Sequence, residues 1–559
     1  MNIEEVQRRL WEQSKDHKRF RESGTPLFPT NPYDGRVRNL MDLMHNPTWI
    51  MAACDRVLKR SRGKAAGVDG VRVHEFEKTR DHRLEQLRLE LKRGTYQPLP
   101  LRRVEIPKAN GKMRQLGIPC LRDKIVQEAI RMSLEPVFEV EFHANSYGFR
   151  PNRSAHHAVA QCRNAALGGF TWVIEGDVKA CFDEISHRAI LACVREKVMD
   201  NKFVGLINRL LKAGVEIDGV VYPTTKGVPQ GGVASPLLAN AVLNKLDWFL
   251  DSKGFYGTAK RRRSSHSLPN VRFCRYADDW CVFVTRGNRE YAERLRDEIR
   301  DFLQKTCGLE LSAEKTRITH VRDGYDFLGF HIGIGVGQSG KLVPKVKVGR
   351  KAIAKIQLRL GQALRYRPTQ ESISVRLVQA SAVIRGWSNY FKAAHNFSRV
   401  AHGLDHKAFW IAAKAICRKE DISTAKCFRR YRFGNTIGVH TACTLARFQD
   451  TAASYYYSSP EPYQPGWNQR YLEDDEWEAA FILSERSRPG CGDLKWKALV
   501  RDGFHCRGCA VTVTSKTSQA DHIVPVNRFA NLEMANDLDN IQTLCLRCHR
   551  LKTERTQRA

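Results

Sequence analysis

Short blocks of apolar residues alternate with polar ones along most of the chain, and one block is especially informative. Residues 271–285, VRFCRYADDWCVFVT, are two apolar runs around a short Ala277-Asp278-Asp279 step. The runs are rich in strand-forming residues, so the pattern predicts a β-hairpin with two carboxylates at its end. One interpretation is a solvated turn, since Asp is common in turns. The other is a divalent-cation site, because hard oxygen ligands suit Mg²⁺.

An earlier stretch contains a further carboxylate at a strand end. In residues 171–184, TWVIEGDVKACFDE, the apolar strand Trp172-Val173-Ile174 ends at Asp177, and a helix begins within a few residues. A Mg²⁺ site for phosphoryl transfer needs a carboxylate beyond the adjacent pair. The strand end lies at a sheet edge, so we expect Asp177 to face the end of the hairpin.

The rest of the pattern predicts one more hairpin, several helices and an apolar strand. Residues 101–118 contain Asn110-Gly111, a strong turn signal between two short strands. The basic side chains of this hairpin either protect a solvated edge strand or grip a triphosphate or template. Apolar residues at helical spacing predict three helices, at residues 123–142, 235–250 and 289–303. Residues 325–333, YDFLGFHIG, are predicted to form an apolar strand.

Composition limits the class of protein and its partners. The chain has 559 residues, enough for several domains, and its 42% hydrophobic content excludes a disordered chain. Its formal net charge is +32, with 92 Lys and Arg against 60 Asp and Glu. Such an excess implies a polyanionic partner, most often nucleic acid. Charge alone does not identify a reaction, because a ribosomal or membrane-surface protein can be equally basic.

The sequence predicts a cytoplasmic protein without a membrane partner. No apolar run approaches the roughly 20 residues that span a bilayer. The first residues, MNIEEVQRRLWEQ, lack the apolar core of a secretory signal. Twelve of the 16 cysteines are scattered singly, as expected of reduced, buried thiols.

The other four cysteines form two CxxC pairs in one short C-terminal stretch. In a reducing compartment this spacing predicts a structural tetrahedral Zn²⁺ site, with disulfide bonds as the alternative. The four candidate zinc ligands are Cys506, Cys509, Cys545 and Cys548.

The motifs, taken in order, resemble the fingers and palm of a reverse transcriptase. YADD in an apolar hairpin is preceded by IPKANGKMRQLGIP, GDVKACFDEI and PQGGVASPLLAN, in the order of that family. GKAAGVDG and SYGFRPNRSAHHAV are similar to the group II intron reverse transcriptases, or maturases, in particular. The match covers nearly the whole chain.

This resemblance implies roles for the matching acidic and aromatic positions. Asp177 and Asp278 would bind two Mg²⁺ ions, with Asp279 beside them, to activate a primer 3′-oxygen and stabilise the leaving pyrophosphate. Phe182 would lie under the incoming sugar and exclude a ribose 2′-hydroxyl. The alternative for Phe182 is a place in the hydrophobic core.

The resemblance also implies contacts with the dNTP. Arg114, together with Lys112 or Lys108, would hold the triphosphate. Gln230 and its neighbouring glycines would lie against the template–nucleotide pair, where only small residues allow close approach. Lys315 is a candidate proton donor to pyrophosphate.

The C-terminal stretch resembles an HNH endonuclease. His522 would be the general base that activates water, which its near-neutral pKa suits. Asp521 and His549 would bind a divalent ion, Mg²⁺ by expectation, at the scissile phosphate, and Asn540 would orient His522. The alternative is a zinc-dependent DNA-binding module without catalysis.

A basic region follows the predicted palm. Residues 327–370 contain no acid, and nine Lys and Arg lie within residues 341–367. A solvated helix would mix signs, so we expect a surface that follows nucleic-acid phosphates. Residues 374–397 resemble the family's thumb, where intron RNA binds. We expect its aromatic residues, Trp387, Tyr390 and Phe391, in a helix-bundle core rather than stacked on bases.

The implied fold is multidomain α+β: right-hand polymerase fingers and palm with an antiparallel sheet, a helical thumb and a small zinc-stabilised ββα-metal domain. The expected domains are 1–100 (N-terminal extension and start of the fingers), 101–335 (fingers and palm), 336–425 (thumb or maturase domain), 426–490 (DNA-binding region and linker) and 491–559 (HNH endonuclease).

The function implied is an RNA-directed DNA polymerase of a mobile group II intron. It would bind intron RNA in a ribonucleoprotein, promote splicing, use dNTPs, and nick target DNA to prime reverse transcription. This predicts a bacterial protein that associates with the nucleoid when it acts on DNA. The alternatives are a freestanding reverse transcriptase in defence or repair and a splicing cofactor without catalysis. The oligomeric state stays open.

Overall fold

The computed structural model divides the chain into two compact units. The first unit contains residues 1–346 and 456–473, and the second contains residues 347–455 and 474–559. The structure describes residues 1–23, 35–61, 63, 65–107, 113–254, 269–285, 287–337, 339–365, 372–440, 443–454, 460, 463, 498, 501–502, 505–511, 513, 518–523, 540–549 and 551–552.

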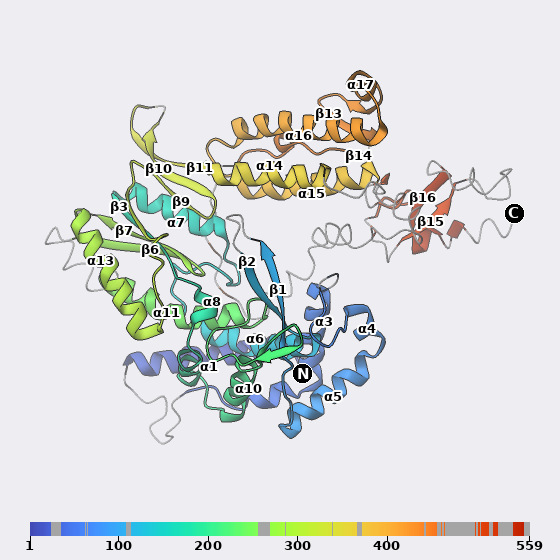
Figure 1. The fold of residues 1–559 in the computed structure, drawn as a ribbon. Helices are drawn as coiled ribbons and strands as arrows, with labels where there is room; N and C mark the ends of the chain where they lie inside the picture. Colours follow the sequence, from blue (N-terminus) through green and yellow to red (C-terminus); the bar gives the residue numbers. More distant parts are fainter. Residues whose placement is uncertain are drawn as a thin grey trace. The chain divides into compact units, whose positions relative to one another are not determined.

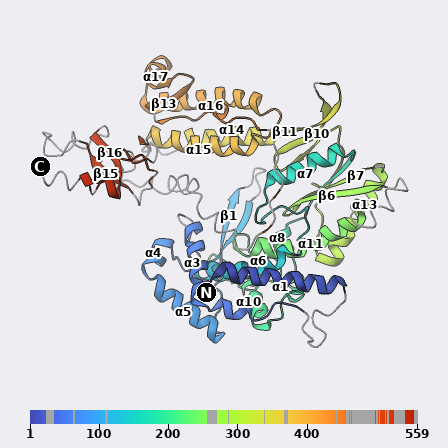
Figure 2. The same cartoon turned by 180° about the vertical axis from the view of Figure 1, so that it is seen from behind.

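Helices form one part of the first unit, arranged around a long buried helix, α6 (Leu121–Glu139). This helix confirms the one expected at 123–142, and it accommodates Pro136 without ending there. Helices α1 and α3 pack directly on it, and Figure 2 shows α1 beside it. The helices that precede α6 are α1 (Ile3–Ser23), α2 (Leu40–Met44), α3 (Pro47–Ser61), α4 (Val73–Lys78) and α5 (Arg80–Arg93).

The basic hairpin expected over residues 101–118 is present. Strands β1 (Leu101–Pro107) and β2 (Met113–Ile118) pair antiparallel. Two short strands, β4 (Val215–Ile217) and β5 (Val220–Tyr222), extend the sheet in the order β2-β1-β4-β5. The Asn110-Gly111 turn lies outside the described residues.

A four-stranded antiparallel sheet is the second part of the first unit (Figure 1). Its order is β6-β7-β3-β8, with β3 (Trp172–Asp177), β6 (Asn270–Tyr276), β7 (Asp279–Thr285) and β8 (Arg317–His320).

Helices lie against both faces of this sheet. Val271 and Phe273 of β6 belong to the core that includes residues of α11 (Ser235–Lys253) and α13 (Arg289–Phe302). Cys274, on the opposite face by strand alternation, donates a hydrogen bond to Ala158 O of α7 (Ala155–Leu167) at 3.4 Å. Helices α11 and α13 confirm the helices predicted at 235–250 and 289–303. The helices between β3 and β4 are α8 (Cys181–Glu184), α9 (His187–Arg195) and α10 (Asn201–Leu211).

The prediction of a single apolar strand over residues 325–333 is wrong. The segment folds as a hairpin of β9 (Tyr325–Phe327) and β10 (Phe330–Val336), paired antiparallel. The turn consists of Leu328, with φ 49°, and Gly329, with φ 83°. Because the turn residue Leu328 is apolar, no polar break marks the turn in the sequence. Strand β11 (Leu342–Val348) completes a β11-β10-β9 sheet.

The second unit contains a helical bundle. Trp387 packs against Phe391, Phe397 and Phe448, with ring centroids 4.7, 6.4 and 5.3 Å away, which confirms the core placement expected for Trp387 and Phe391. The unit's elements are α14 (Arg350–Arg365), α15 (Ile373–Phe391), α16 (Phe397–Glu420), α17 (Thr424–Tyr431), β12 (Arg432–Phe433), β13 (Thr436–His440), β14 (Cys443–Thr444), β15 (Ser518–His522) and β16 (Ile541–Cys545).

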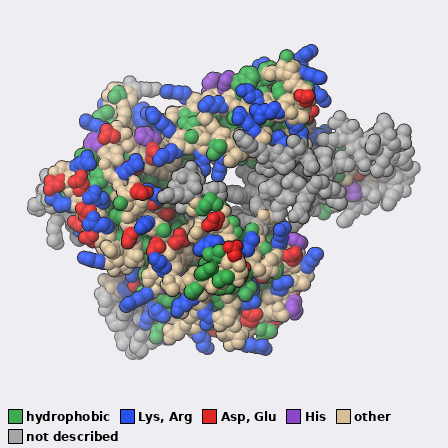
Figure 3. Space-filling model, viewed as in Figure 1, with side chains coloured by type: hydrophobic (Ala, Val, Ile, Leu, Met, Phe, Trp, Pro, Cys, Tyr) green, Lys and Arg blue, Asp and Glu red, His purple; other side chains and the backbone are tan. Residues whose placement is uncertain are grey.

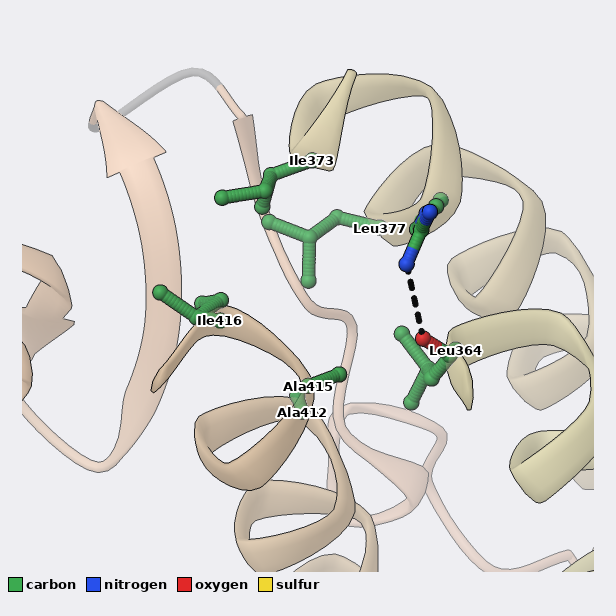
Figure 4. A pocket seen from close by; sticks show the side chains of 7 residues that line it. Leu364, Ile373, Leu377, Ala412, Ala415 and Ile416 are labelled. Carbon is green, nitrogen blue, oxygen red and sulfur yellow. Dashed lines mark hydrogen bonds between the residues drawn. The ribbon is translucent and has the colours of Figure 1, made fainter. Parts of the chain in front are cut away.

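A small cavity inside this bundle is a packing defect rather than a binding site. Leu364, Leu377 and Ile416 line it (Figure 4), and its volume is about 10 Å³, roughly that of one water molecule. Across the described parts of both units, no helix is long and apolar enough to cross a membrane.

Candidate active sites

The β6–β7 hairpin has the predicted form. Tyr276 pairs with Asp279, which leaves Ala277 and Asp278 as a two-residue turn. Ala277 has φ 59°, the left-handed conformation that such tight hairpin turns require. The hairpin therefore places the Asp278 and Asp279 carboxylates at the end of the sheet.

Strand pairing brings the third carboxylate to the same place. β3 runs antiparallel to β7, and Asp177 lies directly opposite Asp279. Directly opposed residues in an antiparallel pair have Cβ atoms about 5 Å apart. The expectation that Asp177 meets the hairpin end is confirmed, and three carboxylates gather at one sheet edge.

The charges of this cluster are only partly balanced. Loss of water around the Asp279 carboxyl, followed by the negative charges of Asp278 and Asp177, raises the pKa of Asp279 to about 7, although the residue still reaches solvent. Lys315 Nζ lies 2.6 Å from Asp177 Oδ2, and this hydrogen bond raises the pKa of Lys315. Crowded carboxylate oxygens with one nearby cation are a donor set that suits Mg²⁺.

A buried ion pair supports the turn from behind. Arg275 donates to both carboxylate oxygens of Asp247, at 2.7 and 2.6 Å, and to Asn240 Oδ1 at 2.8 Å. It also donates to Ala277 O at 2.9 Å. Arg275, Asp247 and Asn240 are each at most 1% exposed. The guanidinium therefore fixes the backbone of the residue before Asp278.

The glycine-rich loop before α11 lies between α8 and β2. Gln230 Nε2 donates to Asp183 Oδ2 at 2.7 Å, and Gln230 O accepts from Gly117 N at 3.1 Å. Val228 N donates to Phe182 O at 2.6 Å. At Gly231, φ is 121° and a Cβ would lie 2.9 Å from Gly117 O, so a side chain does not fit there. Gln230 and Phe182 thus lie near each other.

The other residues expected to contact the nucleotide are only partly described. Lys108 and Lys112 lie outside the described residues. Arg114 pairs with Ile106 through its strand, and only its backbone is described. Phe182 is half-buried and packs against the hydrophobic core.

The four C-terminal cysteines come together. Their Sγ atoms all lie within 4.8 Å of one another, and all four are free thiols. Cys506 Sγ accepts from Cys545 N at 3.2 Å and from Gly508 N at 3.4 Å. Burial would raise the pKa of Cys506, but these backbone N–H donors outweigh it and lower the pKa to about 6. Four converging sulfurs with N–H donors fit a tetrahedral zinc–thiolate site.

The polar residues of the same module surround a two-stranded antiparallel sheet, β15–β16, and a helix over residues 546–549 follows. His549 Nε2 lies 3.9 Å from Asp521 Oδ1. Lys552 Nζ, which the sequence did not suggest, lies 2.5 Å from Asp521 Oδ2. Asn540 O accepts from Ile523 N at 2.7 Å. The side chain of His522 is outside the described part of the chain, and its backbone pairs with Ile541.

Comparison with known proteins identifies both regions. Residues 106–332 match the family of reverse transcriptases (RNA-dependent DNA polymerases), and residues 506–555 match the HNH endonucleases. Protein YkfC of Escherichia coli (strain K12) is 40% identical over 318 residues, which cover 53% of this chain and 83% of that protein. The group II intron-encoded protein LtrA of Lactococcus lactis subsp. cremoris is 27% identical over 577 residues, covering 87% of this chain and 91% of that protein.

The chain belongs to the group II intron-encoded reverse transcriptases. This reverse transcriptase is an RNA-directed DNA polymerase and maturase with an HNH endonuclease domain, as its motifs indicated. Both domain types act with divalent metal ions. A solved telomerase from Candida albicans has a TM-score of 0.34 and 11% identity, over 58% of this chain and 62% of that chain, a similarity too low to add to the assignment.

The structure of the reverse transcriptase adds residues that the motifs did not reveal. Arg275 and Asp247 are separated by 28 positions, and nothing in the sequence pairs them. A charge inside an apolar strand run, as at Arg275 in VRFCRY, was the available signal, because a buried charge needs a partner. The Lys552–Asp521 pair had no comparable signal.

Proposed function

We propose that Asp177, Asp278 and Asp279 are the polymerisation site of this reverse transcriptase and bind two Mg²⁺ ions. The observation that supports this most is the strand register, which sets Asp177 opposite Asp279 and leaves Asp278 in the adjoining turn. RNA binding alone needs no clustered carboxylates. Bound Mg²⁺ supplies activation of the primer 3′-hydroxyl and charge balance for the departing pyrophosphate.

The surrounding residues would orient the nucleotide and move its protons. Lys315, which is hydrogen-bonded to Asp177, would donate a proton to pyrophosphate. Phe182 would contact the sugar, and Gln230, held by Asp183, would contact the template–nucleotide pair. Arg114, with Lys112 or Lys108, would bind the triphosphate.

Replacement of one carboxylate tests the site. Asp278→Ala removes an oxygen ligand from the cluster, so primer extension on an RNA template should be abolished while RNA binding persists. Extension that survives in Asp278→Ala would remove this residue from the metal site. Asp297→Ala, a surface acid on α13, is the control and should extend primers like the parent.

We propose that the second unit binds intron RNA through its basic face. On the face shown in Figure 3, Lys and Arg side chains greatly outnumber Asp and Glu over α14 and α16. The expected fingers and palm (101–335), thumb (336–425), DNA-binding region (426–490) and endonuclease (491–559) remain our proposed domain limits. A cytoplasmic ribonucleoprotein with the intron RNA is the proposed working form.

We propose that His522 is the general base of DNA nicking, with Asp521 and His549 binding a divalent ion and Asn540 orienting His522. The 3.9 Å approach of His549 to Asp521 supports this pairing. The nick would provide the 3′ end from which the polymerase copies the inserted intron. His522→Ala should stop nicking of target DNA and leave primer extension unchanged; a variant that still nicks would exclude His522 as the base.

A further inference from the structure

The ring of Phe149 is exposed and lies next to Phe182, close to the proposed polymerisation site. It belongs to the SYGFRPNRSAHHAV motif. The residue is 58% exposed, and its φ of 56° is strained for any residue with a Cβ. Strain in an exposed bulky residue persists only when the surroundings enforce it, and such residues cluster at functional sites.

The residue before Phe149 is fixed against the catalytic turn. A Cβ on Gly148 would lie 2.4 Å from Ala277 N, so only glycine allows the two backbones to approach this closely. Gly148 O accepts a hydrogen bond from Asn240 Nδ2 at 2.8 Å. Asn240 also accepts from Arg275, so one buried network holds both the turn and the residue next to Phe149.

The residue after Phe149 is fixed in the protein interior. The Arg150 side chain is 3% exposed and pairs with Glu139 at 2.8 Å. Its Nη1 donates to His143 O at 2.7 Å and to Ser146 O at 2.8 Å. With both neighbours fixed, the backbone has no freedom to relax the strained conformation of Phe149.

The ring of Phe149 contacts the proposed sugar-contacting residue. Its centroid lies 6.4 Å from that of Phe182, with the ring planes at 88°, an edge-to-face arrangement. Phe149 therefore adjoins Phe182 through its ring, and its neighbour Gly148 adjoins the turn that bears Asp278. Despite this ring contact, Phe149 remains exposed.

We infer that Phe149 is a specificity-determining residue whose ring forms, with Phe182, an apolar wall against the sugar of the incoming deoxynucleotide; this inference rests on the polymerisation site proposed above. A deoxyribose presents C–H groups to such a wall. A ribose 2′-hydroxyl pressed against two rings would lose water without gaining a hydrogen bond, which disfavours ribonucleotides.

Steady-state extension of oligo(dT) on poly(rA) tests the inference with dTTP and UTP. In Phe149→Ala we expect the KM for dTTP to rise about tenfold and preference for dTTP over UTP to fall several-fold, with kcat within about threefold of the parent. Phe149→Gly should show the same kinetic change yet melt at a higher temperature than Phe149→Ala, because glycine tolerates the positive φ. Comparison of the two variants separates the kinetic effect of losing the ring from the effect of the strained backbone on stability.

Leu167→Ala is the matched control, because Leu167 is equally exposed, at 57%. Leu167 ends α7 and is followed closely by Trp172, the first residue of β3, whereas Asp177 is the last residue of that strand. The Leu167→Ala variant should keep the parental kinetics. Unchanged KM and unchanged dTTP preference in both Phe149 variants would overturn the inference. Weaker binding of the RNA template with unchanged KM for dTTP would also overturn it, by making Phe149 a template contact. Failure of the parent enzyme to extend any primer would instead refute the proposed polymerisation site.

Discussion

Arg275 shows how a single buried charge determines the geometry of the catalytic turn. Its guanidinium neutralises the buried Asp247 carboxylate and also donates to Ala277 O. One side chain therefore balances the charge of Asp247 and holds the turn. Breaking a buried ion pair by removing one partner is strongly destabilising, whereas replacing both partners by apolar residues is often neutral. Stability and turn geometry can therefore be separated by mutation.

We predict that Arg275→Met lowers the free energy of unfolding by about 3–5 kcal/mol, because Asp247 is left buried and unpaired. Arg275→Met combined with Asp247→Leu should recover most of that stability in urea unfolding. Primer extension should stay low in the double variant, because Ala277 O still lacks its donor. A double variant with parental extension would show that Arg275 has no part in positioning Asp278.

Asp123 gives the first unit a specific pH dependence. Burial raises the pKa of Asp123 to about 6, against the hydrogen bonds donated by Tyr96 Oη at 2.6 Å and Leu99 N at 3.1 Å. The folded state therefore binds this proton more tightly than the unfolded chain. Protonation of Asp123 therefore adds to the free energy of unfolding as the pH falls through 6 towards 4, and this contribution is lost as the pH rises.

Asp123→Asn removes this titration and keeps an oxygen for Tyr96 to donate to. We predict that the unfolding free energy of the parent, minus that of Asp123→Asn, is larger at pH 5 than at pH 7 by about 1 kcal/mol. Urea unfolding at both pH values measures the difference. A difference that is constant or larger at pH 7 would contradict the raised pKa.

Residue-level prediction from sequence succeeded where a residue type and its local pattern were sufficient. Asp177 and Asp278 stand at strand ends, so the pattern predicted that they would meet. The partners of Arg275 and the hydrogen bond from Lys315 to Asp177 come from segments far apart in sequence. Such partners depend on how strands and helices pack, which a single sequence does not reveal.

Among the elements, the β1–β2 and β6–β7 hairpins were predicted from the sequence, whereas the β4–β5 and β9–β10 hairpins were not. The β1–β2 and β6–β7 hairpins have polar residues at their turns, whereas the β9–β10 turn contains Leu328. A left-handed φ at a leucine is uncommon, so the residue type at position 328 did not predict a turn. The three helices with predicted bounds, at 123–142, 235–250 and 289–303, match α6, α11 and α13 to within a few residues, because their apolar spacing is regular.

Helix α14 presents a row of basic side chains at four-residue spacing. Lys351, Lys355 and Arg359 are exposed, and the structure records no acidic partner for them among the described residues. We predict that their combined replacement by alanine weakens binding of intron RNA. The slope of log affinity against log salt should fall by about 2 to 3, because each lost phosphate contact releases about one counterion fewer.

Three paired arginines of α13 are the control for this charge change. Arg289, Arg294 and Arg300 bond to Glu293, Glu290 and Asp297 on the same helix. Replacement of these three arginines by alanine removes the same formal charge as the α14 variant, but from side chains that acidic partners already neutralise. The slope of log affinity against log salt should therefore stay near that of the parent. Equal losses in both triple variants would mean that net charge, rather than the α14 face, governs RNA binding.

At the scale of the whole molecule, the two chemistries occupy separate units of the chain. The carboxylate cluster belongs to the first unit and the cysteine cluster to the second. We predict about one zinc ion per parental chain, bound by the four cysteines. Cys545→Ser should lose the zinc and DNA nicking, while RNA-templated extension continues.

Elemental analysis of the purified protein measures the zinc, and nicking and extension assays are run on the same preparation. Cys443→Ser, at a buried thiol in β14 that is not one of the four clustered cysteines, is the control and should retain zinc. A parental protein without zinc, or a Cys545→Ser variant that keeps both zinc and nicking, would exclude the structural zinc site.

The proposed function requires that this reverse transcriptase binds and copies the intron that encodes it. Sequencing the RNA that copurifies with the protein from its native cell tests this most directly. We predict one structured intron, strongly enriched, with the gene for this chain inside it. A diffuse mixture of RNAs bound to an enzyme with intact polymerase activity would contradict the claim, and would indicate a freestanding reverse transcriptase whose endonuclease domain serves another purpose.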